Sequence, residues 1–306
     1  MKKVLLILQL VMSTVLYAQK KTDITDGYII WETEDFKKYT PIIKCSLNIR
    51  GLILTSQMTD DGIGFVLTEG KEMPTDFDYY FFFYDFKKQN ETPIYVIKYQ
   101  ELNRDIKCAY YSDGIIFSLE VTKNNPEECF ITKRTLNSPM IIEEFKIDTF
   151  FSPHNYQYAK TLYVDEDNDR VLCVYSKHID DKHVQKFLTI LSFSSGKELF
   201  CCKTDLSNII LDGKEVYLSE KNKLFKINYQ DTTFKPTEIM TFIPEKETII
   251  AMQKNNDIYV VRTEYWKFNL ALKFLFGNNS QIWSYYACKF QDEKLQKIKK
   301  LKEPKK

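Results

Sequence analysis

Two short polar segments of the sequence hold side chains at spacings that suit metal binding. In DEDNDR, Asp165, Asp167 and Asp169 alternate as the first ligands of a calcium-binding loop do. The pattern then breaks, because Arg170 and Ser176 stand where such a loop needs a glycine and a bidentate glutamate. We interpret DEDNDR as a solvated hairpin turn and keep a calcium site as the alternative.

The segment KHIDDKH holds four side chains of the types that bind metal ions in proteins: His178, Asp180, Asp181 and His183. It also stands where a loop between two hairpins is expected, and such loops are polar in any case. We expect a surface loop here, with a metal site as the alternative. No cofactor is indicated, because the nine glycines form no glycine-rich phosphate loop and no CxxC pair is present.

The sequence lacks the residue patterns that carry nucleophilic catalysis. It has no GxSxG stretch, and FSSGKEL lacks the strand-to-helix turn that presents a nucleophilic serine. Its 42 acidic residues are too numerous for one pair to stand out as acid and base. Catalysis therefore finds little support in the residues themselves.

The stretch WKFNLALKFLF alternates apolar and polar positions, which is typical of a strand with one apolar face. Its apolar face includes four aromatic side chains: Trp266, Phe268, Phe274 and Phe276. An exposed apolar face of this kind would be a surface for a partner or for self-association. We expect a long strand packed within its sheet and keep the partner surface as the alternative.

The elements that must position these segments are β-strands. Several runs share one layout, in which an apolar strand is followed by a tight turn of Asp, Asn or Gly and then by a second strand. Such turns tolerate the positive φ of a tight hairpin. One aspartate marks the turn of each hairpin, and the markers recur every 43 to 56 residues: Asp61, Asp113, Asp169, Asp212 and Asp257.

A second hairpin follows each of the marked ones, for example in ECFITKRTLNSPMIIEEFKI. Two hairpins make a four-stranded meander of about 45 residues, which is the size of a β-propeller blade. We expect one further outer hairpin in TDGYIIWETEDFKKYTPIIKCSLN. We expect it to complete the ring by pairing with strands from the other end of the chain. The sequence therefore predicts an all-β β-propeller of four-stranded blades, six in number, with five as the alternative.

The segment YYFFFYDF has aromatic side chains at seven of its eight positions. As a strand it places Tyr79, Phe81 and Phe83 on one face and Tyr80, Phe82, Tyr84 and Phe86 on the other. A blade is packed between neighbouring blades, so both faces of its middle strands are dry. We predict that this segment is a buried blade strand, with a ligand platform as the alternative.

The first 18 residues have the layout of a secretory signal peptide. Lys2 and Lys3 precede the apolar stretch VLLILQLVM, and Ala18 ends the segment before Gln19. No stretch after this segment is long and apolar enough for a spanning helix, so we expect no integral membrane segment after cleavage. The expected organisation is a signal peptide at 1–18, one β-propeller domain at 19–301 and a basic tail at 302–306. We expect an exported, soluble protein in the periplasm or outside the cell.

The charge of the chain argues against a nucleic-acid partner. The formal net charge is +1, and the sequence has only five arginines, which are scattered. A near-neutral protein has no overall field that attracts a polyanion, and bidentate phosphate recognition relies on arginine. The seven cysteines form an odd set in strand-like surroundings, and we interpret them as small buried side chains, with a structural disulfide as the alternative.

The repeat layout, together with Ala18-Gln19 at the signal junction, resembles uncharacterised secreted six-bladed β-propeller proteins of Bacteroidota. This resemblance implies a fold and export, and no functional residue follows from it. The favoured hypothesis is a non-enzymatic binding or scaffolding propeller that recognises a protein or glycan through loops at one end of its ring. The alternative is a carbohydrate-active or other hydrolytic propeller with carboxylates at the central channel.

Overall fold

The computed structural model describes residues 22–23, 46–47, 52–58, 62–68, 79–85, 90–97, 103–112, 114–147, 156–179, 183–241, 246–255, 257–267 and 280–301. Within these ranges the chain forms strands, turns and bends, and no helix occurs there. The described residues accordingly include no helix that could cross a membrane. The prediction of an all-β protein is confirmed.

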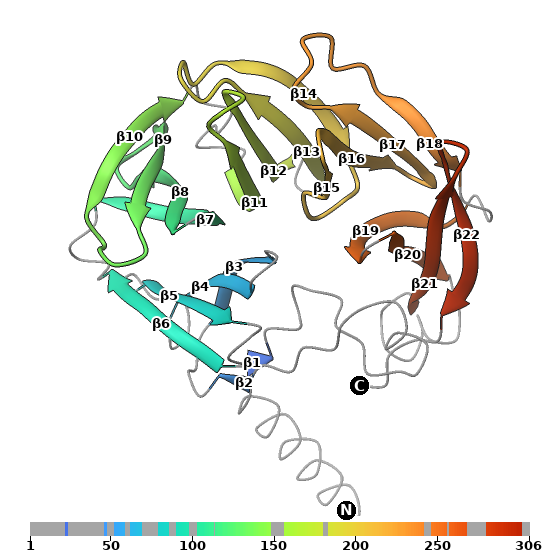
Figure 1. The fold of residues 1–306 in the computed structure, drawn as a ribbon, viewed down its shortest axis with the longest axis horizontal. Coiled ribbons are helices and arrows are strands. Elements are labelled where there is room, and N and C mark those ends of the chain that lie inside the picture. The colour runs from blue at the N-terminus through green and yellow to red at the C-terminus, as the bar shows by residue number, and fades with distance from the viewer. Residues whose placement is uncertain are drawn as a thin grey trace, which may run out of the picture. The chain divides into compact units, whose positions relative to one another are not determined.

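Five four-stranded antiparallel sheets follow one another along the described chain, and Figure 1 shows the strands of each sheet lying in sequence order. The first sheet contains β3 (Leu52–Met58), β4 (Gly62–Thr68), β5 (Tyr79–Asp85) and β6 (Asn90–Ile97). The second contains β7 (Arg104–Ser112), β8 (Ile115–Thr122), β9 (Asn125–Thr135) and β10 (Ile141–Ile147).

The third, fourth and fifth sheets repeat this meander. The third contains β11 (Tyr156–Asp165), β12 (Arg170–His178), β13 (Val184–Leu191) and β14 (Glu198–Thr204). The fourth contains β15 (Leu211–Asp212), β16 (Glu215–Glu220), β17 (Lys223–Asn228) and β18 (Thr237–Thr241). The fifth contains β19 (Thr248–Asn255), β20 (Ile258–Lys267), β21 (Ser280–Gln291) and β22 (Lys294–Leu301).

A meander of four consecutive antiparallel strands is the blade unit of a β-propeller, and its repetition confirms the predicted fold class. The two strands β1 (Thr22–Asp23) and β2 (Ser46–Leu47) pair with each other as a separate ladder. Of the expected N-terminal outer hairpin, residues 25–48, only Ser46–Leu47 lie within the described ranges. The blade count of six stays a prediction.

The turns of the first hairpins explain why the aspartate markers recur. Among the described markers, Asp169 and Asp257 fall in the β11–β12 and β19–β20 connections, and Asp212 is the last residue of β15, directly before the turn into β16. At three of these turns a residue has a positive φ: 79° at Gly114, 56° at Asp169 and 59° at Gly213. Glycine and aspartate tolerate this conformation, so local turn chemistry sets the period of the repeat.

The contacts divide the chain into two compact units. The first unit contains β3 to β8, the second contains β11 to β22, and β9 and β10 contribute residues to each. In the first unit, the core between the first two sheets includes Val66, Tyr79 and Phe81 together with Ile106 and Ile116. The side chains of Tyr79 and Phe81 are 1% and 0% exposed, which confirms the buried strand predicted for YYFFFYDF on that face. The side chains of its other face lie outside the described residues.

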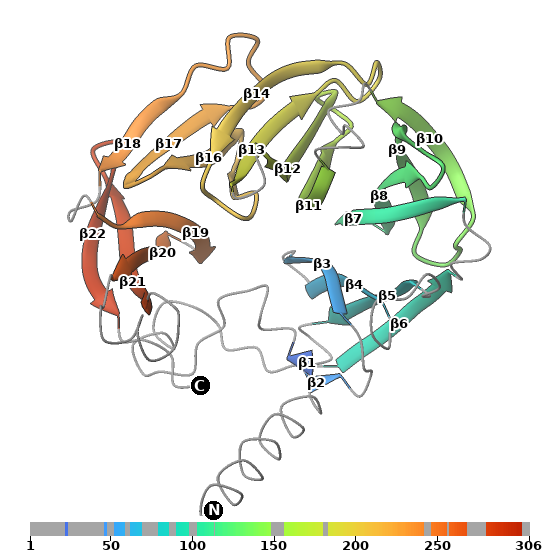
Figure 2. The same cartoon turned by 180° about the vertical axis from the view of Figure 1, so that it is seen from behind.

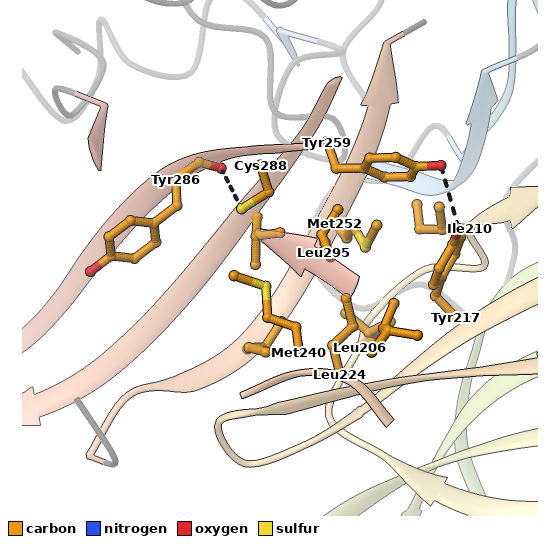
Figure 3. Packing of buried hydrophobic residues seen from close by; sticks show 13 residues of the cluster. Leu206, Ile210, Tyr217, Leu224, Met240, Met252, Tyr259, Tyr286, Cys288 and Leu295 are labelled. Atoms are coloured by element: carbon orange, nitrogen blue, oxygen red, sulfur yellow. Dashed lines mark hydrogen bonds between the residues drawn. The ribbon is translucent and has the colours of Figure 1, made fainter. Parts of the chain in front are cut away.

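In the second unit, the fourth sheet is covered on both faces. Val216 and Leu218 of β16 pack with the third sheet, whereas Tyr217, which lies between them in the strand, packs with the fifth. Figure 3 shows the cluster between the fourth and fifth sheets, in which Leu224 and Met240 lie with residues of β19 to β22. Because alternate side chains of a strand enter different cores, an apolar run is needed instead of an alternating pattern.

The described cysteines follow the same packing. Four of them are buried and form no disulfide: Cys108, Cys129, Cys173 and Cys288. Cys201 and Cys202 are neighbours in β14, and both are free, but Cys201 is exposed while Cys202 is half-buried against the core between the third and fourth sheets. The interpretation as buried side chains is therefore confirmed for four cysteines and wrong for Cys201, which is exposed on β14, the last strand of its sheet. Cys45 lies outside the described residues.

Candidate functional site

A cluster of polar side chains joins the fourth and fifth sheets where β15 ends. β15 stops at Asp212 because Gly213, with its positive φ, starts the turn into β16. The Oδ1 atom of Asp212 accepts a hydrogen bond from the ammonium group of Lys254, which lies on β19. Its Oδ2 atom accepts one from the hydroxyl of Tyr259 on β20 at 2.5 Å and one from the hydroxyl of Tyr217 on β16 at 3.3 Å.

The two tyrosines of this cluster also contact each other. The rings of Tyr217 and Tyr259 pack edge to face with centroids 5.8 Å apart, and their hydroxyl oxygens lie 3.3 Å apart (Figure 3). Both side chains are buried, at 2% exposure, so their hydroxyls need partners inside the protein. Asp212 provides that partner, and the cluster thus connects β15, β16, β19 and β20.

Electrostatics fix the protonation state of this cluster at neutral pH. Burial raises the pKa of Asp212, but hydrogen bonds from Lys254 and Tyr259 outweigh burial, and the pKa lies below its ordinary value. Burial and the hydrogen bond to Asp212 raise the pKa of Tyr259 above its ordinary value, and burial also raises that of Tyr217. The carboxylate is therefore ionised, both phenols are protonated donors, and each carboxylate oxygen accepts at least one hydrogen bond.

A second cluster of the same chemistry joins the third and fourth sheets. The hydroxyl of Tyr229, which follows β17, donates a hydrogen bond of 2.9 Å to Oδ2 of Asp165 at the end of β11. The backbone and side-chain amides of Asn168 donate to the same carboxylate at 2.9 to 3.1 Å. Tyr163 packs edge to face on Tyr229, with ring centroids 5.9 Å apart. At both junctions, an aspartate that ends the first strand of one sheet accepts from a tyrosine of the next sheet.

This geometry assigns a different role to two of the aspartates in DEDNDR. Asp165 contacts the next sheet, whereas Asp169 accepts hydrogen bonds from the hydroxyl of Ser192 at 2.8 Å and from the backbone amide of Ser194 at 2.6 Å. Asp167 is exposed. Among the described residues, no group of three or more His, Cys, Asp or Glu side chains is placed to hold a metal ion. The segment forms the turn between β11 and β12, and the calcium alternative at Asp165, Asp167 and Asp169 stays a prediction.

The other sequence-predicted sites are described only in part. His183 is exposed, and its backbone carbonyl accepts a hydrogen bond of 2.9 Å from Ile179 across the loop. His178 ends β12, but its side chain and residues 180–182 lie outside the description. The backbone of Trp266 pairs with Gln281 in the β20–β21 ladder. Phe268, Phe274 and Phe276 lie outside the described residues, so the metal and partner-surface alternatives here stay predictions.

The sequence analysis did not reveal a buried ion pair that lies within the first unit. Arg134 on β9 is 1% exposed, and its Nη1 atom lies 2.6 Å from Oε1 of Glu120 on β8, which is fully buried. The same Nη1 atom donates to the hydroxyls of Ser118 and Thr132 at 2.6 and 2.5 Å. Polar residues two apart in otherwise apolar strands, in SLE and TKR, are the sequence signal that could have revealed this cluster.

No protein-family model and no curated protein matches the chain. Solved structures similar to it include the β-propeller domain of the Trilobed protease from Pyrococcus furiosus, at 10% identity and a TM-score of 0.45, over 81% of this chain and 70% of that one. The structure of YjhT is similar at 10% identity and a TM-score of 0.45, over 87% of this chain and 86% of its own.

A third similar structure is CoXyl43, a GH43 β-xylosidase/α-arabinofuranosidase from a compost microbial metagenome. It has 9% identity and a TM-score of 0.38, over 79% of this chain and 92% of its own. Likenesses this distant carry no argument about what the present protein binds or catalyses.

Proposed function

We propose that this protein is a non-enzymatic binding or scaffolding module that recognises a protein or a glycan through the turns at one end of its sheets. The observation that carries the proposal is the bracing of two neighbouring first hairpins, β11–β12 and β15–β16, by Asp165 and Asp212. Asp167 and Lys214 at the tips of these hairpins are exposed. Asp165 and Asp212, the last strand residues before each turn, are hydrogen-bonded to tyrosines of the next sheet. A rigid base with polar, exposed tips suits recognition, because little conformational freedom is lost on binding.

The protonation state of Asp212 supports binding over acid–base catalysis. A general acid or base needs a carboxyl group that exchanges its proton near the working pH. The pKa of Asp212 is lowered, and both of its oxygens already accept hydrogen bonds. Asp165 is engaged in the same way by Tyr229 and Asn168. These two carboxylates therefore act as structural braces.

We further propose that the protein works outside the cytoplasm. The support is the signal-like layout of the first 18 residues, with Lys2 and Lys3 before a short apolar stretch. Exported binding modules meet glycans and surface proteins, which are the partner classes that the proposal names.

The proposal is tested by measuring the binding of the chain from Gln19 onward to a glycan array and to immobilised surface proteins of its host. Asp167→Lys and Lys214→Glu reverse charges at exposed tips, and we expect each to weaken the captured interaction while leaving the melting temperature unchanged. Lys203→Glu is the matched control, because Lys203 is exposed on β14, away from these turns. Binding that survives both tip variants would contradict recognition through these turns, and conversion of a captured glycan would favour the hydrolytic alternative.

A further inference from the structure

The last strand of the second sheet, β10, begins with a patch of exposed apolar side chains. Met140, directly before the strand, is 73% exposed, and the first two strand residues, Ile141 and Ile142, are 39% and 55% exposed. Nowhere else in the described chain are three consecutive large apolar residues exposed to this extent. We call these three residues the β10 patch. Single exposed apolar residues are ordinary, whereas a contiguous patch indicates an interaction surface.

The backbone of β10 has an edge that can pair with another strand. In the described part of the chain, β10 pairs only with β9, and Figure 2 shows it at one end of the second sheet. An edge strand presents a row of amide and carbonyl groups that a strand of another chain can use. The β10 patch therefore combines exposed apolar side chains with an available strand edge.

The last strands of the third, fourth and fifth sheets have features that normally prevent edge pairing. β22 carries four lysines, and its pairing with β21 contains a register shift. β18 has only five residues, and β14 carries charged side chains at Glu198 and Lys203. Lysines, bulges and short lengths are the usual protections of an edge strand. The β10 patch contains no charged side chain, so this part of the edge lacks that protection.

Contacts with the buried ion pair hold the start of the patch in place. The Nε atom of Arg134 donates a hydrogen bond of 3.0 Å to the backbone carbonyl of Pro139, the residue before the patch. The hydroxyl of Ser138 accepts a hydrogen bond of 3.2 Å from the backbone amide of Met140. Because Arg134 is itself fixed by Glu120, the turn that leads into β10 has a rigid support. A surface held in one conformation loses little conformational freedom on association.

The far end of β10 is covered by the turn between β13 and β14. Gly196 in this turn lies so close to β10 that a Cβ atom added to it would be 2.2 Å from the carbonyl oxygen of Lys146. Phe145 also packs on Phe193 of the same turn, with ring centroids 4.1 Å apart. The accessible part of the strand is therefore its first half, which contains the β10 patch.

The sequence of this half is complementary to a second copy of itself in antiparallel orientation. With a two-fold axis at Ile141, this residue lies opposite its own copy, and Met140 lies opposite Ile142 of the other chain. Met140 and Ile142 of both chains then share one face of the joined sheet, where their side chains bury each other. In this register neither Glu143 nor Glu144 lies opposite a glutamate of the other chain, so like charges are not opposed.

We propose that two copies of the protein associate through β10, which pairs with its own copy about a two-fold axis at Ile141. The backbone edges of the two strands form hydrogen bonds, and the two β10 patches bury each other. Closed two-fold dimers are the commonest oligomers of soluble proteins. The surface is separate from the hairpin tips at Asp167 and Lys214, so this association goes beyond the function proposed above, and either can fail alone.

The first test is sedimentation velocity of the chain from Gln19 onward over a series of concentrations, which we expect to show a reversible dimer. Ile142→Lys should raise the dissociation constant at least about tenfold, because the two-fold axis places the substitution in the interface twice. Ile298→Lys is the matched control, since Ile298 is 50% exposed on β22, another last strand, and this variant should leave the dissociation constant unchanged. Asp167→Lys should leave it unchanged as well.

The second test examines the register by cysteine cross-linking with copper phenanthroline as the oxidant. It uses the Cys201→Ser background, which removes an exposed thiol. Ile141→Cys should form a disulfide-linked dimer, because opposite residues of antiparallel strands have Cα atoms within disulfide range. Glu144→Cys should not, because the two copies of position 144 lie six residues apart along the joined strands, or about 20 Å.

Several results would overturn the proposal. Sedimentation as a monomer at every concentration would leave the edge of β10 to another protein. A dimer that Ile298→Lys weakens as much as Ile142→Lys, or that Glu144→Cys cross-links as well as Ile141→Cys, would place the association elsewhere or in another register. If Ile142→Lys lowers the melting temperature, Met140→Lys replaces it, because Met140 lies outside the strand. An unchanged dissociation constant for that folded variant would contradict the proposal.

Discussion

Replacing Arg134 with methionine removes the cation that faces Glu120 inside the first unit. The two side chains are 1% and 0% exposed, and Nη1 lies 2.6 Å from Oε1. With about 4 Å between charge centres and an effective dielectric constant of about 20, the lost attraction is about 4 kcal/mol. Removing one partner of a buried ion pair typically costs about 3–5 kcal/mol, because the other charge remains buried without compensation. We expect a loss of that size in the free energy of unfolding.

The measurement is urea-induced unfolding followed by far-ultraviolet circular dichroism, with the variant and the unmodified protein compared at a common slope. Lys226→Met is the matched control. Lys226 pairs with Glu215 at 2.8 Å, but both side chains are about a quarter exposed. A partly exposed pair of this kind contributes about 1 kcal/mol or less, so the control should lose little stability.

The double variant Glu120→Gln with Arg134→Met tests the cause of the loss. Glutamine keeps an oxygen that can accept the hydrogen bonds of Ser118 and Thr132, which reach Oε1 of Glu120 at 2.9 and 2.8 Å. Replacing both charges with neutral residues is often close to neutral for stability. The double variant should therefore recover most of the loss. The reasoning is refuted if Arg134→Met costs no more than Lys226→Met, or if the double variant is as unstable as the single one.

Three further predictions concern the core, the pH dependence and the metal alternatives. Phe81→Asp should prevent folding or lower the free energy of unfolding by more than about 4 kcal/mol, because it places an unpaired charge in the core of the first unit. Phe81→Leu should lower it by only about 1–3 kcal/mol. Similar urea midpoints for the two variants would contradict this prediction. The pKa of Asp212 is lowered in the folded state, so its stabilising effect is present above the unfolded pKa of about 3.9 and is lost as pH falls through the folded value. The stability difference between the unmodified protein and Asp212→Asn should therefore shrink in thermal unfolding below about pH 4, and a difference that grows there would show that the sign is wrong. A chelator should leave the melting temperature unchanged, since only an ion bound to the native state shifts it. A fall that calcium or zinc restores would establish the metal alternative, either at Asp165, Asp167 and Asp169 or at His178 and His183.

The sequence revealed those parts of the fold that depend on local chemistry. Turns such as Asp113-Gly114 and Asp212-Gly213 require residues that tolerate positive φ, so they mark hairpins without any knowledge of packing. The buried face of YYFFFYDF was equally readable, because continuous aromatic strands need dry surroundings on both faces.

The candidate sites were less predictable, because they depend on which sheet lies against which. Asp165 stands in a segment that looks like part of a calcium loop, and its contact with Tyr229, 64 positions later in the chain, decides its role as a brace. The same holds for Glu120 and Arg134, whose pairing depends on β8 lying beside β9. Contacts between strands distant in sequence leave only weak local signals, such as polar residues two apart in an apolar strand.

The central claim is that the protein binds its ligand without converting it. The most direct measurement is mass spectrometry of the ligands that the chain from Gln19 onward captures from a mixture of host glycans and surface proteins, after a long incubation at neutral pH. We predict that every captured ligand is recovered with its mass unchanged, by the unmodified protein and by Asp212→Asn alike. Hydrolysed products that form with the unmodified protein and disappear with Asp212→Asn would contradict the claim and identify Asp212 as a catalytic group.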